Sequence, residues 1–230
     1  FDINTEHVAA TQHRIADLGL HAHVEHGDFY EIDWPGFLGG LPGSLLVVGN
    51  PPWVTNSAIG AVGGSNLPVK SNFQGHSGFA AKTGKANFDI SEWMLIRLVE
   101  ALQDKRATLA MLCKTSTARK VLRHAWRKGL RLGDTSLHLI DAARHFSVSV
   151  DACLLLTHTD SASADSVATI YGTLDFEAPI QTFGIVNGEF VSDVNAYRDL
   201  SDLGGIEYRR WRSGVKHDAA KVMEFKTTED

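Results

Sequence analysis

The sequence has few cysteines, no long apolar run and no basic leader segment, and each absence excludes a class of protein. Cys113 and Cys153 are the only cysteines in the chain, and each lies in an apolar segment. This placement favours buried, reduced thiols over a disulfide framework. No apolar run approaches the roughly 20 residues of a membrane helix. The chain opens Phe1-Asp2-Ile3-Asn4, without the basic and apolar regions of a signal peptide. We therefore predict a cytoplasmic protein that makes no contact with a membrane.

A metal-binding pattern is also lacking. His21, His23 and His26 are close in sequence but have neither the spacing nor the partners of a zinc site. We interpret them as surface or strand-edge residues, and we predict no metal.

Positive charge is scarce overall but concentrated in one segment. The net charge is −5, which by itself argues against a nucleic-acid-binding protein. Residues 105–131, however, contain nine lysines and arginines and no acidic residue. Such a block is either an electrostatic footprint for phosphate or the solvated face of a helix. The sequence leaves both interpretations open.

The order of the predicted elements indicates an α/β fold. Residues 1–4 resemble the end of a strand, and Thr5 is a candidate cap for a helix over residues 6–18 that stops at Gly19. A short strand at 21–25, a Gly/Pro-rich connection at 34–43 and an apolar strand at 44–48 follow. Strand, helix, strand, loop and strand in this order are typical of a doubly wound parallel sheet.

The middle of the chain continues this alternation after a long loop. Residues 55–86 are rich in Gly, Ser and Asn and lack periodicity, which indicates a functional or mobile loop, such as a lid over a substrate. Apolar periodicity then predicts further elements: a helix at 87–104, a strand at 108–113, a helix at 116–128, and strands at 137–140 and 150–157.

A run of small polar residues at 161–166 suggests a boundary. We predict one domain over residues 1–160 and a β-rich extension, or the start of a DNA-recognition region, over residues 161–230. Strands are expected at 167–171 and 183–191, and Asn187-Gly188 is a good hairpin turn. Residues 209–218 form a basic and aromatic tail.

The most informative stretch is Asn50-Pro51-Pro52-Trp53, hereafter the NPPW turn. It directly follows the apolar strand at 44–48, with Gly49 between them. Each proline fixes its own φ and keeps the preceding residue extended, so the turn is stiff. It presents the Asn50 amide, main-chain carbonyls and the Trp53 ring at the carboxyl end of a strand, where open α/β sheets bind ligands. Such groups suit an amino group attached to an aromatic ring. The alternative is an ordinary turn in which Trp53 anchors the core.

With these pieces in order, the chain resembles class I S-adenosylmethionine-dependent methyltransferases. The resemblance is to the amino-group DNA methyltransferases of the adenine-N6 kind found in restriction-modification systems. It covers nearly all of residues 1–160 and implies their Rossmann-like sheet, S-adenosylmethionine as cofactor and DNA as partner. The NPPW turn matches the catalytic tetrapeptide, with Trp53 in place of the commoner tyrosine.

The resemblance assigns further residues by position. Asp2, with Ile3 beside it, corresponds to the residue that grips the cofactor ribose, and Asp28-Phe29 to the pair that holds the adenine; Asn50 also borders the cofactor. Phe146 resembles an aromatic that packs on the extruded base opposite Trp53. If the basic block contacts DNA, its candidates are Lys114, Arg119, Lys120 and Arg123. For Lys114, a plain helix start is the favoured interpretation.

Two parts of the family pattern are missing. The first strand and its glycine-rich loop, which hold the methionine end of the cofactor, should precede Asp2. A separate target-recognition domain should follow the catalytic one, and it is absent or only begun in residues 200–230. We therefore expect the chain to belong to a longer protein.

Other targets remain possible on the sequence alone. The same type of tetrapeptide serves cytosine-N4 methylation of DNA and glutamine-N5 methylation of proteins, and a non-catalytic DNA-binding fragment is a further alternative. The long loop and the basic block favour DNA. The recognition sequence, an accompanying nuclease activity and the oligomeric state are not indicated.

Overall fold

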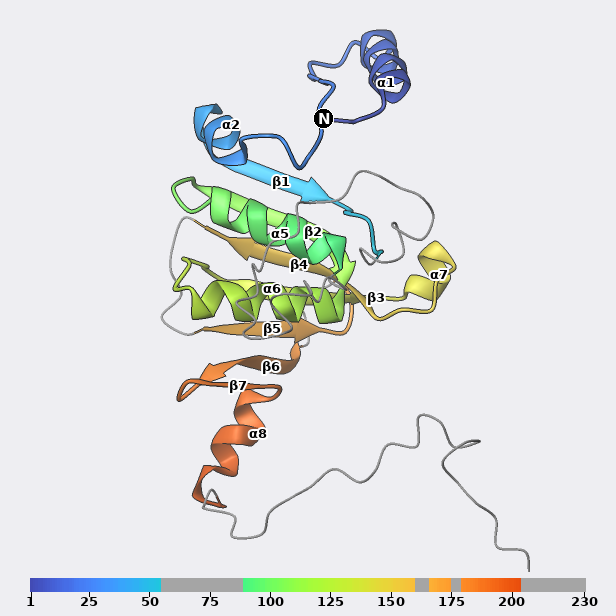
Figure 1. Cartoon of the computed structure of the whole chain (residues 1–230). Coiled ribbons are helices and arrows are strands. Elements are labelled where there is room, and N and C mark those ends of the chain that lie inside the picture. The colour runs from blue at the N-terminus through green and yellow to red at the C-terminus, as the bar shows by residue number, and fades with distance from the viewer. Residues whose placement is uncertain (55–88, 160–165, 175–178, 204–230) are drawn as a thin grey trace, which may run out of the picture.

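Seven strands form one mixed sheet in the computed structural model, which describes residues 1–54, 89–159, 166–174 and 179–203. Their order across the sheet is β1-β2-β4-β3-β5-β6-β7 (Figure 1). The predicted lid at 55–86 and the basic tail at 209–218 lie outside the described residues. The strands are β1 (Leu45–Gly49), β2 (Ala107–Lys114), β3 (Thr135–Ile140), β4 (Ala152–His158), β5 (Val167–Tyr171), β6 (Pro179–Val186) and β7 (Glu189–Val191).

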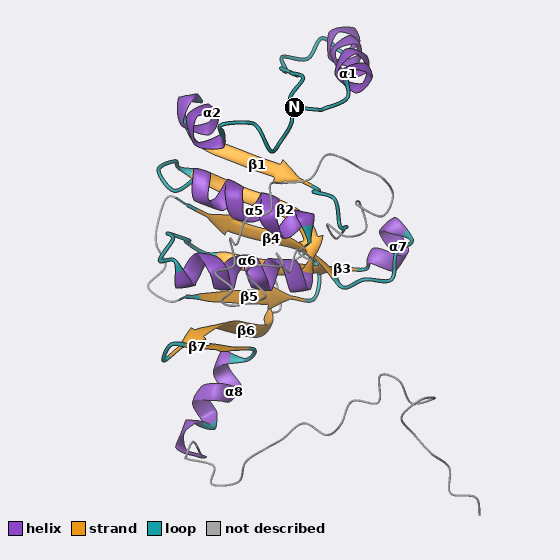
Figure 2. Ribbon diagram, in the orientation of Figure 1, coloured by secondary structure: helices purple, strands orange, loops and turns teal. Residues whose placement is uncertain are grey.

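The helices surround this sheet unevenly. Figure 2 shows α5 and α6 lying over the same face of the central strands, whereas α1 lies beyond the β1 edge, near the N-terminus. The helical elements are α1 (Thr5–Asp17), α2 (Trp34–Gly40), α5 (Ile90–Ala101), α6 (Thr115–Arg127), α7 (Ala142–Phe146), α8 (Val194–Asp199) and the short 3-10 turn η1 (Ser201–Leu203). Within the part of the chain that is described, none of these helices is long and apolar enough to cross a membrane.

The pairing of the strands confirms the predicted Rossmann-like α/β class. β1 pairs in parallel with β2, and β3 pairs in parallel with β5. β4 lies between β2 and β3 and runs antiparallel to both, so the sheet is mixed and not purely parallel. β1 lies at one edge of the sheet.

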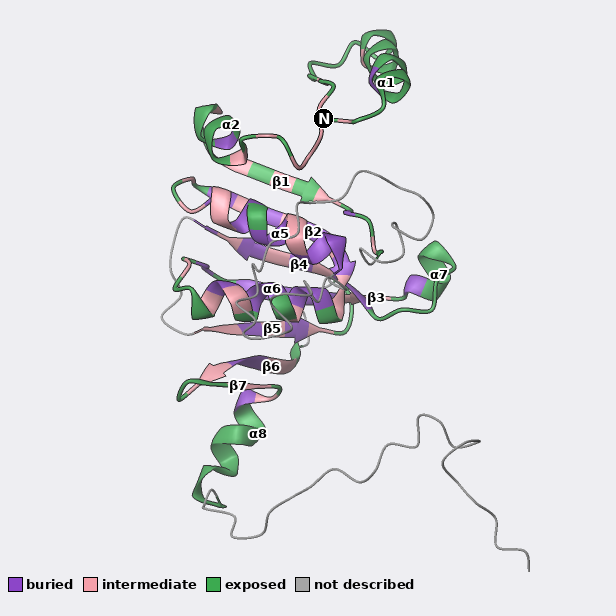
Figure 3. Cartoon of the chain, in the orientation of Figure 1, coloured by how far each residue is buried: buried purple, intermediate pink, exposed green. Residues whose placement is uncertain are grey.

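The core lies between the sheet and the two central helices (Figure 3). Alternate residues of β2 are buried, as expected of a strand with one face against helices. Leu109 of β2 and Leu155 of β4 are fully buried there, together with Leu95 of α5 and Leu122 of α6. Their burial is the main source of stability, at about 1.5–3 kcal/mol for each side chain.

Both cysteines belong to this core, which confirms the predicted burial of the thiols. Cys113 of β2 and Cys153 of β4 are free and lie directly opposite one another in the antiparallel register. A hydrogen bond to Cys153 and burial raise the pKa of the Cys113 thiol. Cys113 is therefore a neutral packing residue and not a nucleophile.

The strands after residue 160 extend the same sheet. β5 joins it through β3, β6 pairs antiparallel with β5, and β7 returns along β6. The turn between β6 and β7 is the one predicted, because Asn187 and Gly188 both adopt positive φ angles of 53° and 84°. The predicted antiparallel hairpin within 183–191 is therefore confirmed. The β-rich extension shares one sheet with the preceding residues.

Three local predictions need correction. The cap of α1 is Asn4 and not Thr5, since the Asn4 side chain accepts a hydrogen bond from the Glu6 N–H at 2.8 Å. The strand expected at 21–25 is reduced to one parallel bridge between Asp2 and His26. The connection expected at 34–43 contains α2, because Asp33 caps it and a proline occupies its first turn, where no N–H is needed.

Candidate active site

The NPPW turn leaves the sheet at the carboxyl end of β1. The last pair of the parallel register joins Gly49 to Met111 of β2. A Cβ atom at position 49 would lie 2.9 Å from the Met111 sulfur, so only glycine fits here without a shift of the methionine side chain. The close packing of Gly49 against Met111 therefore fixes the backbone position at which Asn50 begins the NPPW turn.

A cavity of about 730 Å³ brings the NPPW turn together with the N-terminal segment. The sequence-predicted residues on its wall come from three separate stretches of the chain: Asp2 and Ile3, then Asp28 and Phe29, then Asn50, Pro51 and Pro52. The floor is apolar and is provided by β1, β2 and α5 through Val47, Met111, Met94, Leu95 and Leu98.

A short parallel contact holds the two acidic residues beside the cavity. The Asp2 N–H donates to the Glu25 carbonyl at 3.1 Å, and the Gly27 N–H donates to the Asp2 carbonyl at 3.1 Å. These bonds place Asp2 next to the segment that carries Asp28. Two residues that are 26 positions apart therefore border one cavity.

The carboxylate of Asp2 is stabilised as an anion. Its Oδ1 accepts a hydrogen bond from the Asn4 N–H at 2.8 Å, and His7 lies 3.5 Å from its Oδ2. The Asn4 N–H, assisted by His7, holds the pKa of the Asp2 carboxyl below its usual range. Asp2 is partly exposed and is ionised at neutral pH, so it offers acceptors to a hydroxyl donor.

Aromatic rings form the wall beside Asp28. The Phe29 ring packs against Trp34 with centroids 4.6 Å apart, and the Trp34 indole N–H donates to the Phe29 carbonyl at 2.9 Å. Tyr30 packs on Trp93 of α5 at 5.2 Å. Burial, with Asp28 nearby, raises the pKa of the Tyr30 hydroxyl, which stays a neutral donor. A flat heterocycle fits such a wall.

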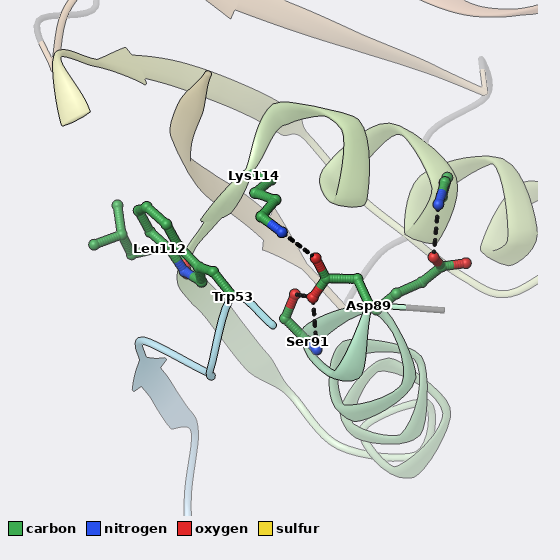
Figure 4. Close-up of polar contacts among 7 residues, drawn as sticks. Trp53, Asp89, Ser91, Leu112 and Lys114 are labelled. Carbon is green, nitrogen blue, oxygen red and sulfur yellow. Dashed lines mark hydrogen bonds and ion pairs between the residues drawn. The ribbon is translucent and has the colours of Figure 1, made fainter. Parts of the chain in front are cut away.

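Trp53 and Phe146 lie next to each other. Their ring centroids are 5.7 Å apart and the rings meet edge to face at 72°. The Trp53 indole N–H donates to the Leu112 carbonyl of β2 at 3.3 Å (Figure 4). Both rings are partly exposed. The two rings do not form a parallel slot in this arrangement.

The four basic candidates all have partners within the chain. Lys114 forms an ion pair with Asp89 at 2.7 Å, and Lys120 forms one with Glu92 at 3.1 Å. The guanidinium groups of the other two lie over aromatic rings: Arg119 over Phe183 at 4.4 Å and Arg123 over Phe190 at 5.8 Å. Contact of these side chains with DNA stays a prediction.

Several residues of the cavity were not singled out from the sequence. Tyr30 and Trp34 lie in an aromatic-rich stretch, and this clustering next to Asp28 is the signal that could have found them. Met94 and Leu98 were predicted only as the apolar face of a helix. Among the described residues, no group of three histidines, cysteines or carboxylates is arranged to hold a metal ion.

Comparison with known proteins gives one strong sequence match. The chain is 43% identical over 208 residues to the Type II methyltransferase M.NspV of Nostoc sp. (strain ATCC 29411 / PCC 7524). The chain resembles a Type II methyltransferase. The alignment covers 90% of the chain but 43% of that protein, so the chain spans less than half the length of its relative. Since 208 aligned residues exceed the predicted 160-residue domain, the similarity continues into the extension.

Two other comparisons add less. No family model matches the chain. Among solved structures, the DNA complex of the Type IIL restriction-modification enzyme MmeI matches with a TM-score of 0.42 and 13% sequence identity. This match covers 80% of the chain and 24% of the MmeI chain.

The position of Trp53 predicts that its ring matters for a ligand and not for folding. Because the ring is half-buried, Trp53→Ala should lower the free energy of unfolding by less than the roughly 3–5 kcal/mol of a buried aromatic. Trp53→Phe should keep a stacking face and most of the methyl transfer that we propose for this site, whereas Trp53→Ala should lose it. Urea denaturation measures the stability, methylation of unmodified DNA measures the activity, and the fluorescence of a duplex with 2-aminopurine at the target position reports base flipping. An unfolded Ala variant, or one with unchanged flipping and methylation, would make Trp53 a packing residue.

Proposed function

We propose that this chain is the catalytic part of a DNA methyltransferase that transfers a methyl group from S-adenosylmethionine to the N6 amine of adenine. The observation that carries the proposal is the cavity that joins Asp2 and Asp28-Phe29 to the NPPW turn. The name of the 43% identical relative, a Type II methyltransferase, supports the reaction class and a place in a restriction-modification system.

The cavity fits the adenosine part of this methyl donor. Its volume of about 730 Å³ lies in the range of small-molecule sites, about 300–1,000 Å³. The anionic Asp2 suits the two ribose hydroxyls, and the wall formed by Phe29 and Trp34 suits the adenine ring. When bound, S-adenosylmethionine supplies a sulfonium-activated methyl group.

The NPPW turn provides acceptors for the target amine. The amine of adenine is a weak nucleophile because its lone pair is delocalised into the ring. Hydrogen bonds from the amine to the Asn50 side-chain oxygen and the Pro51 carbonyl would favour a pyramidal nitrogen, which has a more available lone pair. Orientation and electrostatic stabilisation of this kind account for much of enzymatic catalysis. No covalent enzyme intermediate is required.

The target base must leave the duplex to reach this turn. Flipping a base costs a few kcal/mol, and stacking on an aromatic side chain returns about 1–3 kcal/mol. Trp53 adjoins the acceptors of Asn50 and Pro51 in sequence, and Phe146 lies beside it. These two rings are our candidates to stack on the base.

Cytosine-N4 methylation uses the same chemistry and is the main alternative. An exocyclic amine on either base satisfies the acceptors of the NPPW turn, so the wall of the base pocket decides between them. Glutamine methylation is less favoured, because the relative is named a Type II methyltransferase. A non-catalytic role is less favoured because Asn50, Pro51 and Pro52 line the same cavity as Asp2 and Asp28.

We also propose that a segment outside these 230 residues holds the methionine end of the cofactor. Within the described part of the chain, β1 has β2 as its neighbour on one side and no strand on the other. Leu46 and Val48 of β1 are exposed at 68% and 67%. Apolar edge strands of this kind are normally paired or covered.

Replacement of Asn50 by alanine should remove methyl transfer while the fold and the cofactor affinity remain. Loss of one such contact is expected to lower kcat by about 10²–10³-fold, because the amine loses an acceptor at the reacting atom. Radiolabelled methyl transfer to DNA by the full-length protein measures this, and mass spectrometry of the digested DNA identifies the methylated base. Asn195→Ala, on the exposed surface of α8, is the control. Activity of Asn50→Ala within a few-fold of the wild type would contradict the assignment, and N4-methylcytosine in the digest would favour the alternative.

Asp2→Asn should weaken S-adenosylmethionine binding by about tenfold or more, because hydrogen bonds to a charged acceptor contribute about 1.5–3 kcal/mol. Titration calorimetry measures the affinity, and Asp17→Asn on the exposed end of α1 is the matched control. Equal affinities for the two variants would place the ribose elsewhere.

A longer form of the protein that includes the proposed segment should bind S-adenosylmethionine more tightly than the 230-residue chain. The reason is that Asp2 and Asp28 border the adenosine end alone. Calorimetry on both forms decides this point. If their affinities agree, the methionine end is held by residues already present.

A further inference from the structure

The end of the NPPW turn is held by two hydrogen bonds to different elements. The Trp53 indole N–H donates to the Leu112 carbonyl near the end of β2 at 3.3 Å. One residue later, the Val54 carbonyl accepts from the Ile90 N–H at 3.0 Å, at the start of α5. The position of the Trp53 ring therefore depends on how the end of β2 and the start of α5 are placed relative to each other.

An ion pair joins these same two elements. Lys114 at the end of β2 contacts Asp89, the cap of α5, with 2.7 Å between Nζ and Oδ2. The Asp89 side chain is 9% exposed and that of Lys114 22%. The other carboxylate oxygen of Asp89 accepts hydrogen bonds from the backbone N–H and the hydroxyl of Ser91. Figure 4 shows this network beside Trp53.

The contacts form a closed ring that includes Trp53. It runs from Trp53 to Leu112, along β2 to Lys114, across the ion pair to Asp89, and through the neighbouring Ile90 back to Val54. Breaking the ion pair leaves a charge in a nearly buried place, which the structure relieves by moving one of the two elements.

We propose that Asp89 and Lys114 are a positioning pair that sets the orientation of the Trp53 ring. The proposal rests on the proposed function for its effect on catalysis, whereas its effect on Trp53 is independent of it. It also gives Lys114 a role inside the protein in place of the predicted contact with DNA. Small displacements of a substrate-positioning group reduce rates by up to about 10²-fold.

The chain offers a closely matched control. Glu92 lies three residues after Asp89 in the first turn of α5, is 3% exposed, and pairs with Lys120 of α6 at 3.1 Å. Asp89→Asn and Glu92→Gln both replace a buried carboxylate by an amide of the same shape in an ion pair to lysine. Only the first pair belongs to the ring around Trp53.

The test combines an NMR spectrum with kinetics on the full-length protein. The indole N–H signal of Trp53 is identified in ¹⁵N-tryptophan-labelled protein by its absence from Trp53→Phe. We expect Asp89→Asn and Lys114→Met to shift or broaden this signal while the other indole signals stay in place. We expect kcat for DNA methylation to fall about 10–100-fold with little change in cofactor affinity. Glu92→Gln should leave the Trp53 signal unchanged and kcat within about twofold.

The outcomes are distinct. An unchanged Trp53 signal in both Asp89→Asn and Lys114→Met overturns the proposal. So does the loss of all indole signals in both variants, since the pair then supports the fold as a whole. An equal shift in Glu92→Gln overturns it as well. If the wild type methylates no DNA, the proposed function fails, and the Trp53 signal still decides the positioning role.

Discussion

The parallel pairing of β1 with β2 is the constraint on which the candidate site depends. Because the two strands run in the same direction, both end at one edge of the sheet, and the segments that follow them meet there. The NPPW turn continues β1, and Lys114 ends β2. A slip of one residue would turn Leu109 away from the core and remove the Leu112 carbonyl from the reach of Trp53. Core packing thus also fixes the register of the site.

Strong local signals explain what the sequence could predict of the fold. The apolar runs of β1 and β2 and the helical periodicity of α5 and α6 lie close to their predicted bounds, because burial on one face dictates the spacing of apolar residues. α2 was missed because its seven residues include three glycines, which are poor helix formers. The only sequence signals for this helix were the Asp33 cap and the proline in its first turn. The strand predicted at 21–25 was wrong because, among the described residues, this segment has no partner strand and only the Asp2–His26 bridge forms beside it.

Local sequence signals also decide which residues of the candidate site could be predicted. The NPPW turn was recognisable because its prolines restrict the backbone locally, and Asp2 and Asp28 were recognisable by their order around it. The internal contacts of the basic block could not be predicted from the sequence, because the residues that its side chains contact are distant in the chain. Arg119 and Arg123 lie over Phe183 and Phe190, which reach α6 only because β6 and β7 join the sheet. Lys114, Arg119, Lys120 and Arg123 thus contact the protein itself, and their contact with DNA stays a prediction.

The two rings beside the NPPW turn are held to different degrees. Trp53 is bound through its indole N–H to β2, and the next residue is bound through its carbonyl to α5. Phe146 ends the five-residue helix α7, is 43% exposed, and is followed by Ser147 with a positive φ of 56°. Edge-to-face contact leaves no space for a third ring between them. The hydrogen bond to β2 therefore fixes the Trp53 face, whereas Phe146 lies on a short helix at the surface.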